Sequence, residues 1–463
     1  MISTDKAPFY FFDIESQWIL EEDKRLNASY YGKDAVSARV IIGSLQQKGI
    51  AIKEAEELAE KIFWPGRFKR LLVSKDDGKP FLTPSEVMLF FPKARKFITA
   101  YPLEVLIEKG WLLITRSGSV GRSLIATDLL AQHILSDDLI RVIPKSREHT
   151  AYLYAYFNTW MGQAFLSKNQ YGASIRHIEP RHVEAVPVPC IPNLSQKVAR
   201  EILKAHKLRE AAQALLLQAQ DLMHTSLQLP KIGKSEEMFT RCFEINASES
   251  NWRLDASYHV PIVKKINQHL DDARLNTIEL GTKIQSIYVP PRFKRPYVEK
   301  EGGIRYLTPS DLPVMKTFDP KYLATEFTDD EKYRLREGEI LVVTDGSIGW
   351  VSIVTPPIAG LYGSNNFARV LPKADLNAGY LLTYLLSSYG QYQLSREIFG
   401  GVVDHITEDQ IKQIRIPLPP YEVQQKIGEV MTLAYTKRDE ANQIEADTVA
   451  FLEAGLKEAA KVS

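Results

Sequence analysis

The chain contains the same series of motifs twice, about half its length apart. Order and spacing are both kept, so the matches indicate duplication of one domain-sized unit rather than chance similarity of short peptides. A repeat of this length exceeds the units that stack in solenoids, and each half should therefore have its own core. The recurring segments are RLNASY (25–30) and RLDASY (253–258), RFKR (67–70 and 292–295), LTPS (82–85 and 307–310), GSVG (118–121) and GSIG (346–349), RVIPK (141–145) and RVLPK (369–373), and the pairs Gly172/His177 and Gly400/His405.

Each copy has two parts. The first part mixes turn residues with short aliphatic runs such as WLLIT at 111–115, LIRVI at 139–143 and EILVVT at 339–344, which predicts a globular domain of mixed α/β (α+β) class. The second part follows a proline cluster and has the pattern of a long helix. The predicted boundaries are 1–189 and 229–418 for the globular domains, and 190–228 and 419–463 for the helices.

Both predicted long helices carry apolar side chains at heptad spacing, the pattern of a helix that packs along another helix. Residues 196–223 include five basic and three acidic side chains, whereas residues 421–460 include eight acidic and four basic ones. These opposite charges favour pairing of the two helices. The alternative is two separate surface helices, each packed on its own domain. The heptad positions are Val198, Glu201, Ala205, Leu208, Ala212, Leu215, Ala219 and Leu222 in the first helix, and Ile427, Val430, Ala434, Lys437, Ala441, Ile444, Thr448 and Phe451 in the second.

The composition is that of a globular protein with more than one domain, with 463 residues, 44% hydrophobic and 25% charged. Lys and Arg number 58 and Asp and Glu 57, so net charge alone does not indicate a polyanionic partner. Residues 61–100 nevertheless include nine basic and three acidic side chains. Two cysteines and the lack of an apolar run of membrane-spanning length predict a cytoplasmic protein with no disulfide framework and no membrane segment.

The duplicated order of motifs resembles that of the DNA specificity (S) subunits of type I restriction-modification systems. The resemblance is carried by the two RL(N/D)ASY openings, the GSVG and GSIG loops, the two Gly/His pairs and the PVP and PLP segments before the long helices. No single motif is specific, but their order, present twice, spans nearly the whole chain. One departure is Asp345 before the second loop, where the first half has Ser117.

The resemblance implies a fold and a set of partners. Each globular domain would be a target-recognition domain that reads one half of a bipartite sequence in double-stranded DNA, and the helices would form an antiparallel coiled coil that spaces the domains. Two modification (methyltransferase) subunits, expected to bind S-adenosylmethionine, would dock on the helices, and restriction (translocase-nuclease) subunits would join the larger complex. This chain would itself bind no cofactor or metal. The residues assigned to partner contacts are Val198, Leu208, Leu215, Leu222, Ile427, Val430, Ile444 and Phe451.

Two basic clusters are the main candidates for DNA contact. Each RFKR segment places three cations around a phenylalanine; the cations attract phosphates, and arginine can also donate two hydrogen bonds to guanine. The alternative is a solvated turn. Recurrence in both halves favours DNA contact, because a surface turn has little reason to keep this sequence. The candidate residues are Arg67, Lys69, Arg70, Arg292, Lys294 and Arg295.

Serine and histidine positions in the other repeated motifs are further candidates. The loop glycines permit close approach of a phosphate to the backbone, although a hairpin with no ligand explains them equally well. In the LTPS segments an acidic residue follows the serine, which favours a helix cap over a phosphate contact. For the histidines a structural role is the better interpretation, with a base contact as the alternative. These candidates are Ser85, Ser119, Arg176, His177, Ser310, Ser347 and His405.

Catalytic motifs are weak in this sequence. Amino-methyltransferases need an Asn/Asp/Ser-Pro-Pro-aromatic loop, and the nearest string here is LPPY at 418–421, whose leucine cannot accept a hydrogen bond from a target amine. The pairs Asp77/Lys79 and Asp319/Lys321 have the spacing of a metal-dependent nuclease, but such pairs arise by chance in a chain this rich in charge. The sequence therefore predicts a non-catalytic DNA-recognition subunit. The alternative is a non-catalytic adaptor whose domains bind protein in a phage-defence complex.

Overall fold

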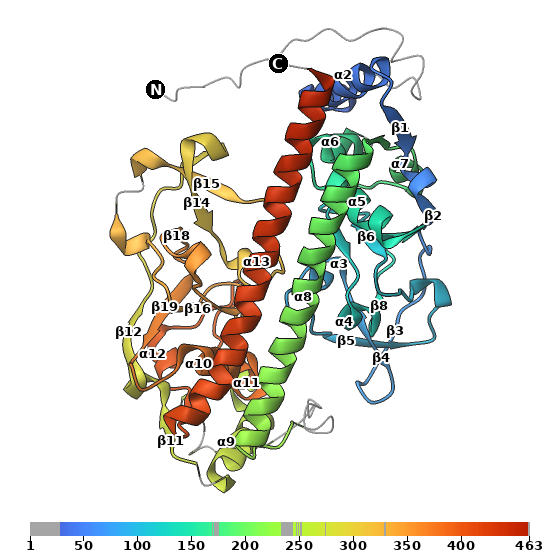
Figure 1. Ribbon diagram of the computed structural model, residues 1–463. Helices are drawn as coiled ribbons and strands as arrows, with labels where there is room; N and C mark the ends of the chain where they lie inside the picture. The colour runs from blue at the N-terminus through green and yellow to red at the C-terminus, as the bar shows by residue number, and fades with distance from the viewer. Residues whose placement is uncertain are drawn as a thin grey trace, which may run out of the picture.

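The computed structural model describes residues 28–168, 170, 176–232, 244–246, 248, 250, 252–273, 275–327 and 330–461. Within these residues, each half of the chain is a mixed α/β domain followed by a long helix (Figure 1). The first three residues of RLNASY, as well as Gly172, lie outside the described residues.

The first half contains ten strands and seven α-helices among the described residues. The strands are β1 (Ala51–Glu54), β2 (Ala59–Phe63), β3 (Leu71–Val73), β4 (Lys79–Leu82), β5 (Lys96–Thr99), β6 (Leu112–Thr115), β7 (Ser123–Ile125), β8 (Ile134–Leu135), β9 (Leu139–Pro144) and β10 (Pro187–Cys190). The helices are α2 (Lys33–Gln47), α3 (Pro84–Val87), α4 (Asp128–Ala131), α5 (Arg147–Phe157), α6 (Trp160–Lys168), α7 (Pro180–Glu184) and α8 (Pro192–Ser226).

The second half repeats this order with fewer short helices. Its strands are β11 (Thr277–Glu279), β12 (Ile284–Tyr288), β13 (Tyr297–Val298), β14 (Gly303–Leu307), β15 (Lys321–Ala324), β16 (Ile340–Val343), β17 (Val351–Ile353), β18 (Tyr362–Gly363), β19 (Phe367–Pro372) and β20 (Arg415–Pro417). Its helices are α9 (Pro261–Asp272), α10 (Ala378–Leu386), α11 (Ser388–Arg396), α12 (Glu408–Lys412) and α13 (Tyr421–Ala460).

Each domain contains two four-stranded sheets of matching topology. The strand orders are β2-β9-β6-β7 and β3-β5-β4-β8 in the first half, and β12-β19-β16-β17 and β13-β15-β14-β18 in the second. The pair β4-β8 and its counterpart β14-β18 are parallel, whereas the neighbouring pairs are antiparallel. The predicted strands at 111–115, 139–143 and 339–344 correspond to β6, β9 and β16. The sequence repeat is therefore a repeat of structure, down to the one parallel pair in each domain.

The long helices α8 and α13 lie side by side and run in opposite directions (Figure 1). Val198, near the start of α8, shares a core cluster with Leu456, near the end of α13. Met223, near the end of α8, shares another with Ile427, near the start of α13. The helices thus pair with each other, and do not form two separate surface helices.

In each long helix, half of the residues predicted to face the other helix are buried, and the other half are each one residue away from the position that is buried. The first predicted residue of each heptad is buried, but the next buried residue follows after four positions instead of three. The sequence alone did not distinguish the two spacings, because apolar runs such as 215–217 satisfy both. In addition, the residues that are buried include charged ones. The inward positions are Val198, Ile202, Ala205, Arg209, Ala212, Leu216, Ala219 and Met223 in α8, and Ile427, Met431, Ala434, Arg438, Ala441, Glu445, Thr448 and Leu452 in α13. Of the predicted residues, Glu201, Leu208, Leu215, Leu222, Val430, Lys437 and Ile444 are only partly buried, and Phe451 is exposed.

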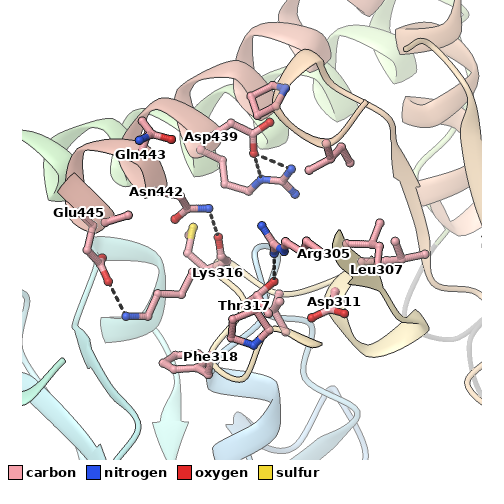
Figure 2. A pocket seen from close by; sticks show the side chains of 18 of the residues that line it. Arg305, Leu307, Asp311, Lys316, Thr317, Phe318, Asp439, Asn442, Gln443 and Glu445 are labelled. Atoms are coloured by element: carbon pink, nitrogen blue, oxygen red, sulfur yellow. Dashed lines mark hydrogen bonds and ion pairs between the residues drawn. The ribbon is translucent and has the colours of Figure 1, made fainter. Parts of the chain in front are cut away.

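A buried polar network joins both domains and both long helices. Glu445 of α13 forms ion pairs with Arg209 of α8 and with Lys316 of the second domain. The pair with Lys316, at 2.5 Å, is drawn in Figure 2. The hydroxyl of Tyr154, on α5 of the first domain, donates to Glu445 at 2.6 Å. The same hydroxyl accepts hydrogen bonds from Arg209 at 3.1 Å and from Lys316 at 3.0 Å. One carboxylate therefore connects the four parts of the molecule.

This network has no polar counterpart at the repeat-related place. Arg209 corresponds to Arg438 in the second helix, but the acid has an apolar equivalent. The equivalents of Tyr154, Lys316 and Glu445 are Leu382, Phe91 and Leu216, at offsets of 228, 225 and 229. Arg438 instead pairs with its neighbour Asp439 at 2.8 Å and lies over the ring of Tyr435. The two halves therefore share the same backbone arrangement, but the network centred on Glu445 occurs only once.

The domains also touch each other directly. The Phe90 amide donates to the Pro313 carbonyl at 2.8 Å, and the Met315 amide donates to the Met88 carbonyl at 2.9 Å. Residues 88–90 and 313–315 are repeat equivalents, so this short antiparallel bridge lies where an approximate twofold axis relates the halves. Main-chain hydrogen bonds, as well as the helices, therefore hold the two domains at a fixed separation.

The Glu445 cluster predicts acid sensitivity. Burial alone would raise the pKa of the Glu445 carboxyl, but Arg209 and Lys316 lower it to about 2. Because the folded-state pKa lies below the unfolded value of about 4.3, this stabilisation is complete above the unfolded pKa and declines as pH falls through it towards 2. Urea unfolding between pH 7 and 3 should show a stability gap between the wild type and Glu445→Gln that narrows in acid. A gap independent of pH would contradict this assignment.

Packing of α10 against α13 depends on a pair of glycines. A Cβ on Gly428 would lie 1.9 Å from Oδ1 of Asn377, and a Cβ on Gly379 would lie 2.4 Å from the carbonyl oxygen of Gly428. We expect Gly428→Ala to lower the free energy of unfolding by about 1–3 kcal/mol, because the overlap outweighs the better helix propensity of alanine. Gly43→Ala in α2 is the control, since its Cβ would meet nothing within 4 Å. That variant should gain about 0.5–1 kcal/mol, and equal gains in both variants would contradict the close approach.

Candidate nucleic-acid interface

Several repeated motifs of the first half meet at one end of the sheet β2-β9-β6-β7. At this end β2 finishes, β9 begins and β6 runs into the GSVG loop. Main-chain hydrogen bonds fix the loops to one another: Arg116 N to Asp138 O (2.9 Å), Gly118 N to Arg176 O (3.2 Å), Ile178 N to Arg116 O (3.0 Å) and Ser136 N to Leu82 O (3.0 Å). We call residues 64–70, 83–85, 116–121, 136–138 and 176–179 the first loop surface.

The second half builds the same surface on the sheet β12-β19-β16-β17. Its main-chain hydrogen bonds fall at the equivalent positions: Thr344 N to Asn366 O (3.0 Å), Gly346 N to Asp404 O (2.8 Å), Ile406 N to Thr344 O (3.0 Å) and Ser364 N to Leu307 O (3.0 Å). Residues 289–295, 308–310, 344–349, 364–366 and 404–407 form the second loop surface. The two surfaces therefore share one backbone scaffold.

The cations of the basic clusters divide into those with a side-chain partner in their own loop surface and the remaining exposed ones. Arg70 forms an ion pair with the buried carboxylate of Asp137, and the equivalent Arg295 donates to the side chain of Asn365. The last arginine of each RFKR segment thus has a partner within its own surface. The remaining candidates, Arg67, Lys69, Arg292 and Lys294, are exposed.

The GSVG and GSIG loops have matching shapes and matching supports. Gly118 and Gly121 have φ angles of +72° and +85°, and the equivalent Gly346 and Gly349 have +86° and +97°. Side chains with a Cβ rarely adopt these angles, which explains why both glycines recur. A glutamine from the neighbouring helix supports each loop: Gln163 Nε2 donates to Gly121 O at 3.0 Å, and Gln391 Nε2 donates to Gly349 O at 2.8 Å. The loop serines Ser119 and Ser347 are exposed at the tips.

The two histidines lie beside these loops. His405 Nδ1 is 2.7 Å from Oδ1 of Asp345, and His177 forms an isolated β-bridge with the equivalent Ser117. The main chain of His177 and the side chain of His405 therefore contact the residue that precedes the loop glycine in each half. Arg176 is exposed next to His177, and its guanidinium donates to Gln170 at 3.3 Å.

The LTPS segments do cap short helices, but through threonine and not through serine. Thr83 and Thr308 precede the first turn, and their hydroxyls contact Glu86 and Asp311 at 2.7 and 2.6 Å. The predicted capping residues, Ser85 and Ser310, lie two residues further along the chain and are exposed. The proline between them explains the shift, because proline favours the first helical position and leaves the preceding residue as the cap.

Sequence reasoning missed the residues at the centre of each surface. Asp137 and Asp138 precede β9, and Asn365 and Asn366 stand at the same place before β19. The sequence repeat could have identified these residues, because both pairs directly precede the strands that contain the repeated RVIPK and RVLPK motifs. Extending that match by a few residues towards the N-terminus aligns SDD at 136–138 with SNN at 364–366.

Among the described residues, no group of three or more His, Cys, Asp or Glu side chains is placed to hold a metal ion. None of the helices in that part of the chain combines the length and apolar character that a membrane span needs.

Comparison with known proteins gives a consistent result. Residues 290–446 match the family model described as the type I restriction modification DNA specificity domain. The type I restriction enzyme MjaVIII specificity subunit of Methanocaldococcus jannaschii is 23% identical over 371 residues, 76% of this chain and 79% of that subunit. A second relative from that organism, named as the MjaX specificity subunit, is 31% identical over 109 residues. That match covers 22% of this chain and about a quarter (26%) of the relative.

A solved structure aligns along most of the chain as well. The crystal structure of a type I restriction-modification S subunit from M. genitalium is 11% identical, with a TM-score of 0.35 over 88% of this chain and 95% of that one. This chain is therefore similar to type I restriction-modification specificity subunits, through residues 290–446 in the family model and through 76% of its length in the MjaVIII subunit.

Proposed function

We propose that this chain is the DNA-recognition subunit of a type I restriction-modification complex, in which each loop surface reads one half of a bipartite target. The observation that carries the proposal is that one scaffold occurs twice with different side chains. The chemistry of the exposed residues suits DNA, because Arg67, Lys69 and Arg292 can attract phosphates from either loop surface. We propose the domain boundaries predicted from the sequence: 1–189 and 229–418 for the globular domains, and 190–228 and 419–463 for the helices.

The paired helices would set the distance between the two half-sites. α8 has 35 residues and α13 has 40, which correspond to lengths of about 50 and 60 Å. This is longer than one turn of DNA, which is about 34 Å. Two recognition domains held apart by such a pair can therefore reach successive major-groove sites on one face of the duplex.

The outer face of the helices is the proposed docking site for modification subunits. Leu217 of α8 and Leu433 and Phe451 of α13 are between 39 and 45% exposed, and they can supply apolar contacts to a partner. Of the residues assigned to partner contacts, Phe451 lies on this face. Methylation, with its S-adenosylmethionine, and cleavage would belong to the partner subunits.

A salt titration of DNA binding by the assembled complex tests the proposal. Binding should be selective for a split sequence, and its affinity should fall steeply with salt because cations on the surfaces replace counterions. Weak, sequence-independent binding would contradict the proposal and favour the adaptor alternative, in which the domains bind protein.

A further inference from the structure

The two loop surfaces differ in chemistry at one pair of equivalent positions. Residues 117 and 138 of the first surface correspond to 345 and 366 of the second, and the same main-chain hydrogen bonds place them in both. In the first surface Ser117 Oγ donates to Asp138 Oδ1 at 2.8 Å. In the second, the acid lies on the opposite side of the pair, because Asp345 replaces the serine and Asn366 replaces the aspartate.

Several neighbouring positions are the same in both halves, although Asp137, the partner of Arg70, is also exchanged, for Asn365. Ser136 and Ser364 are the same residue, as are His177 and His405, and Arg70 and Arg295. The exchanges at 117/345 and 138/366 therefore alter the hydrogen-bonding chemistry offered on an unchanged backbone. The exchanged side chains are partly exposed, and are therefore accessible to a ligand at the surface.

We infer that residues 138 and 366 determine base specificity at the two loop surfaces, with Asp138 selecting a base that presents an amino group and Asn366 selecting adenine. The inference rests on the proposed function. An ionised carboxylate only accepts hydrogen bonds, so Asp138 suits the amino group of cytosine or adenine in the major groove. The amide of Asn366 both donates and accepts, which matches N7 and the amino group of adenine.

The charges around Asp138 make a carboxylate tolerable next to DNA. Arg67 and Lys69 are exposed on the same surface and attract the phosphates, whereas Asp137, the neighbouring acid, is neutralised by Arg70. Asp138 is the other acidic residue of the SDD segment at 136–138. In the second surface, Asp345 lies 2.7 Å from the ring of His405 and Asn366 adds no charge.

The test uses the chain assembled with its modification subunits, acting on a random-sequence DNA library whose methylated sites are read by sequencing. Asp138→Asn should change the base methylated or required at one position of one half-site. It should lower the preference for the original base roughly 5- to 100-fold, the range for one base contact. The other half-site and the spacer should stay the same. The reciprocal variant Asn366→Asp should change one position of the other half-site.

The control is Glu104→Gln, an exposed acid of the first domain that lies outside the loop surface and should leave the motif intact. Because Asn366→Asp preserves side-chain shape, it tests the inference independently if Asp138→Asn fails to fold. An unchanged motif in the folded variants would overturn the inference while leaving the proposed function intact. A wild-type complex with no sequence-selective methylation or binding would overturn both.

Discussion

Replacing Glu445 by alanine is expected to lower the free energy of unfolding by about 3–5 kcal/mol, the cost of removing one partner from a buried ion pair. The side chains of Arg209 and Glu445 are 9 and 7% exposed, and that of Lys316 is 13% exposed. Without the carboxylate, two buried cations would face each other with no acid between them. Because both domains and both helices meet at this point, urea denaturation should show the loss as a lower midpoint of the main transition.

Glu440→Gln is the matched control for this variant. Glu440 lies on the same helix but is exposed, so the change should stay within about 0.5 kcal/mol. A loss below about 1 kcal/mol for Glu445→Ala would mean that the network contributes no more than a surface ion pair. In that case the direct contact between residues 88–90 and 313–315 would be the main link between the domains.

Replacing Arg67, Lys69 and Arg292 together by alanine is expected to weaken DNA binding roughly 100-fold near 0.15 M salt. If each of the three cations neutralises one phosphate, the slope of log affinity against log salt should become shallower by about 2.7. Fluorescence anisotropy of the assembled complex on its methylation target, at several salt concentrations, measures both quantities.

The control triple variant replaces Lys33, Lys53 and Arg147, which are also exposed but lie outside both loop surfaces. It removes the same charge, so any effect of net charge alone appears in both variants. Equal weakening in the two variants would contradict phosphate contact at the loop surfaces. Arg70→Ala is a poor choice for this test, because Arg70 pairs with the buried Asp137 and its loss would disturb the surface itself.

The repeat in the sequence was sufficient to predict a duplicated architecture. Motifs with glycine at positive φ, such as GSVG and GSIG, recur because the backbone requires them, and their spacing follows from the strands between them. Aliphatic runs such as LIRVI marked the central strands correctly. Proline before each long helix marked its start closely, since α8 begins at Pro192 and α13 at Tyr421.

The faces of the long helices were harder to predict. A heptad alternates intervals of three and four, and the apolar residues at 215–217 allow either order. The correct choice depends on Arg209, Arg438 and Glu445, which are buried because they find partners in three dimensions. A pattern of apolar residues alone does not record such pairing, and the prediction was therefore wrong by one position in both helices.

The candidate site was predicted in part, and for a similar reason. The repeated motifs identified the loops, and the exposed cations Arg67, Lys69 and Arg292 lie on them. The pairing of Arg70 and Arg295 depends on Asp137 and Asn365, which are distant in sequence. Their contact follows from the order of the strands, which the sequence pattern did not predict.

The most direct test of the central claim is to sequence the methylated sites after a domain exchange. Residues 1–189 are replaced by the first domain of a type I restriction-modification specificity subunit, and the hybrid is assembled with the modification subunits proposed as partners of this chain. We predict that one half-site changes, while the other half-site and the spacer length remain those of the wild type. A change in both half-sites, or in neither, would contradict independent reading by the two domains.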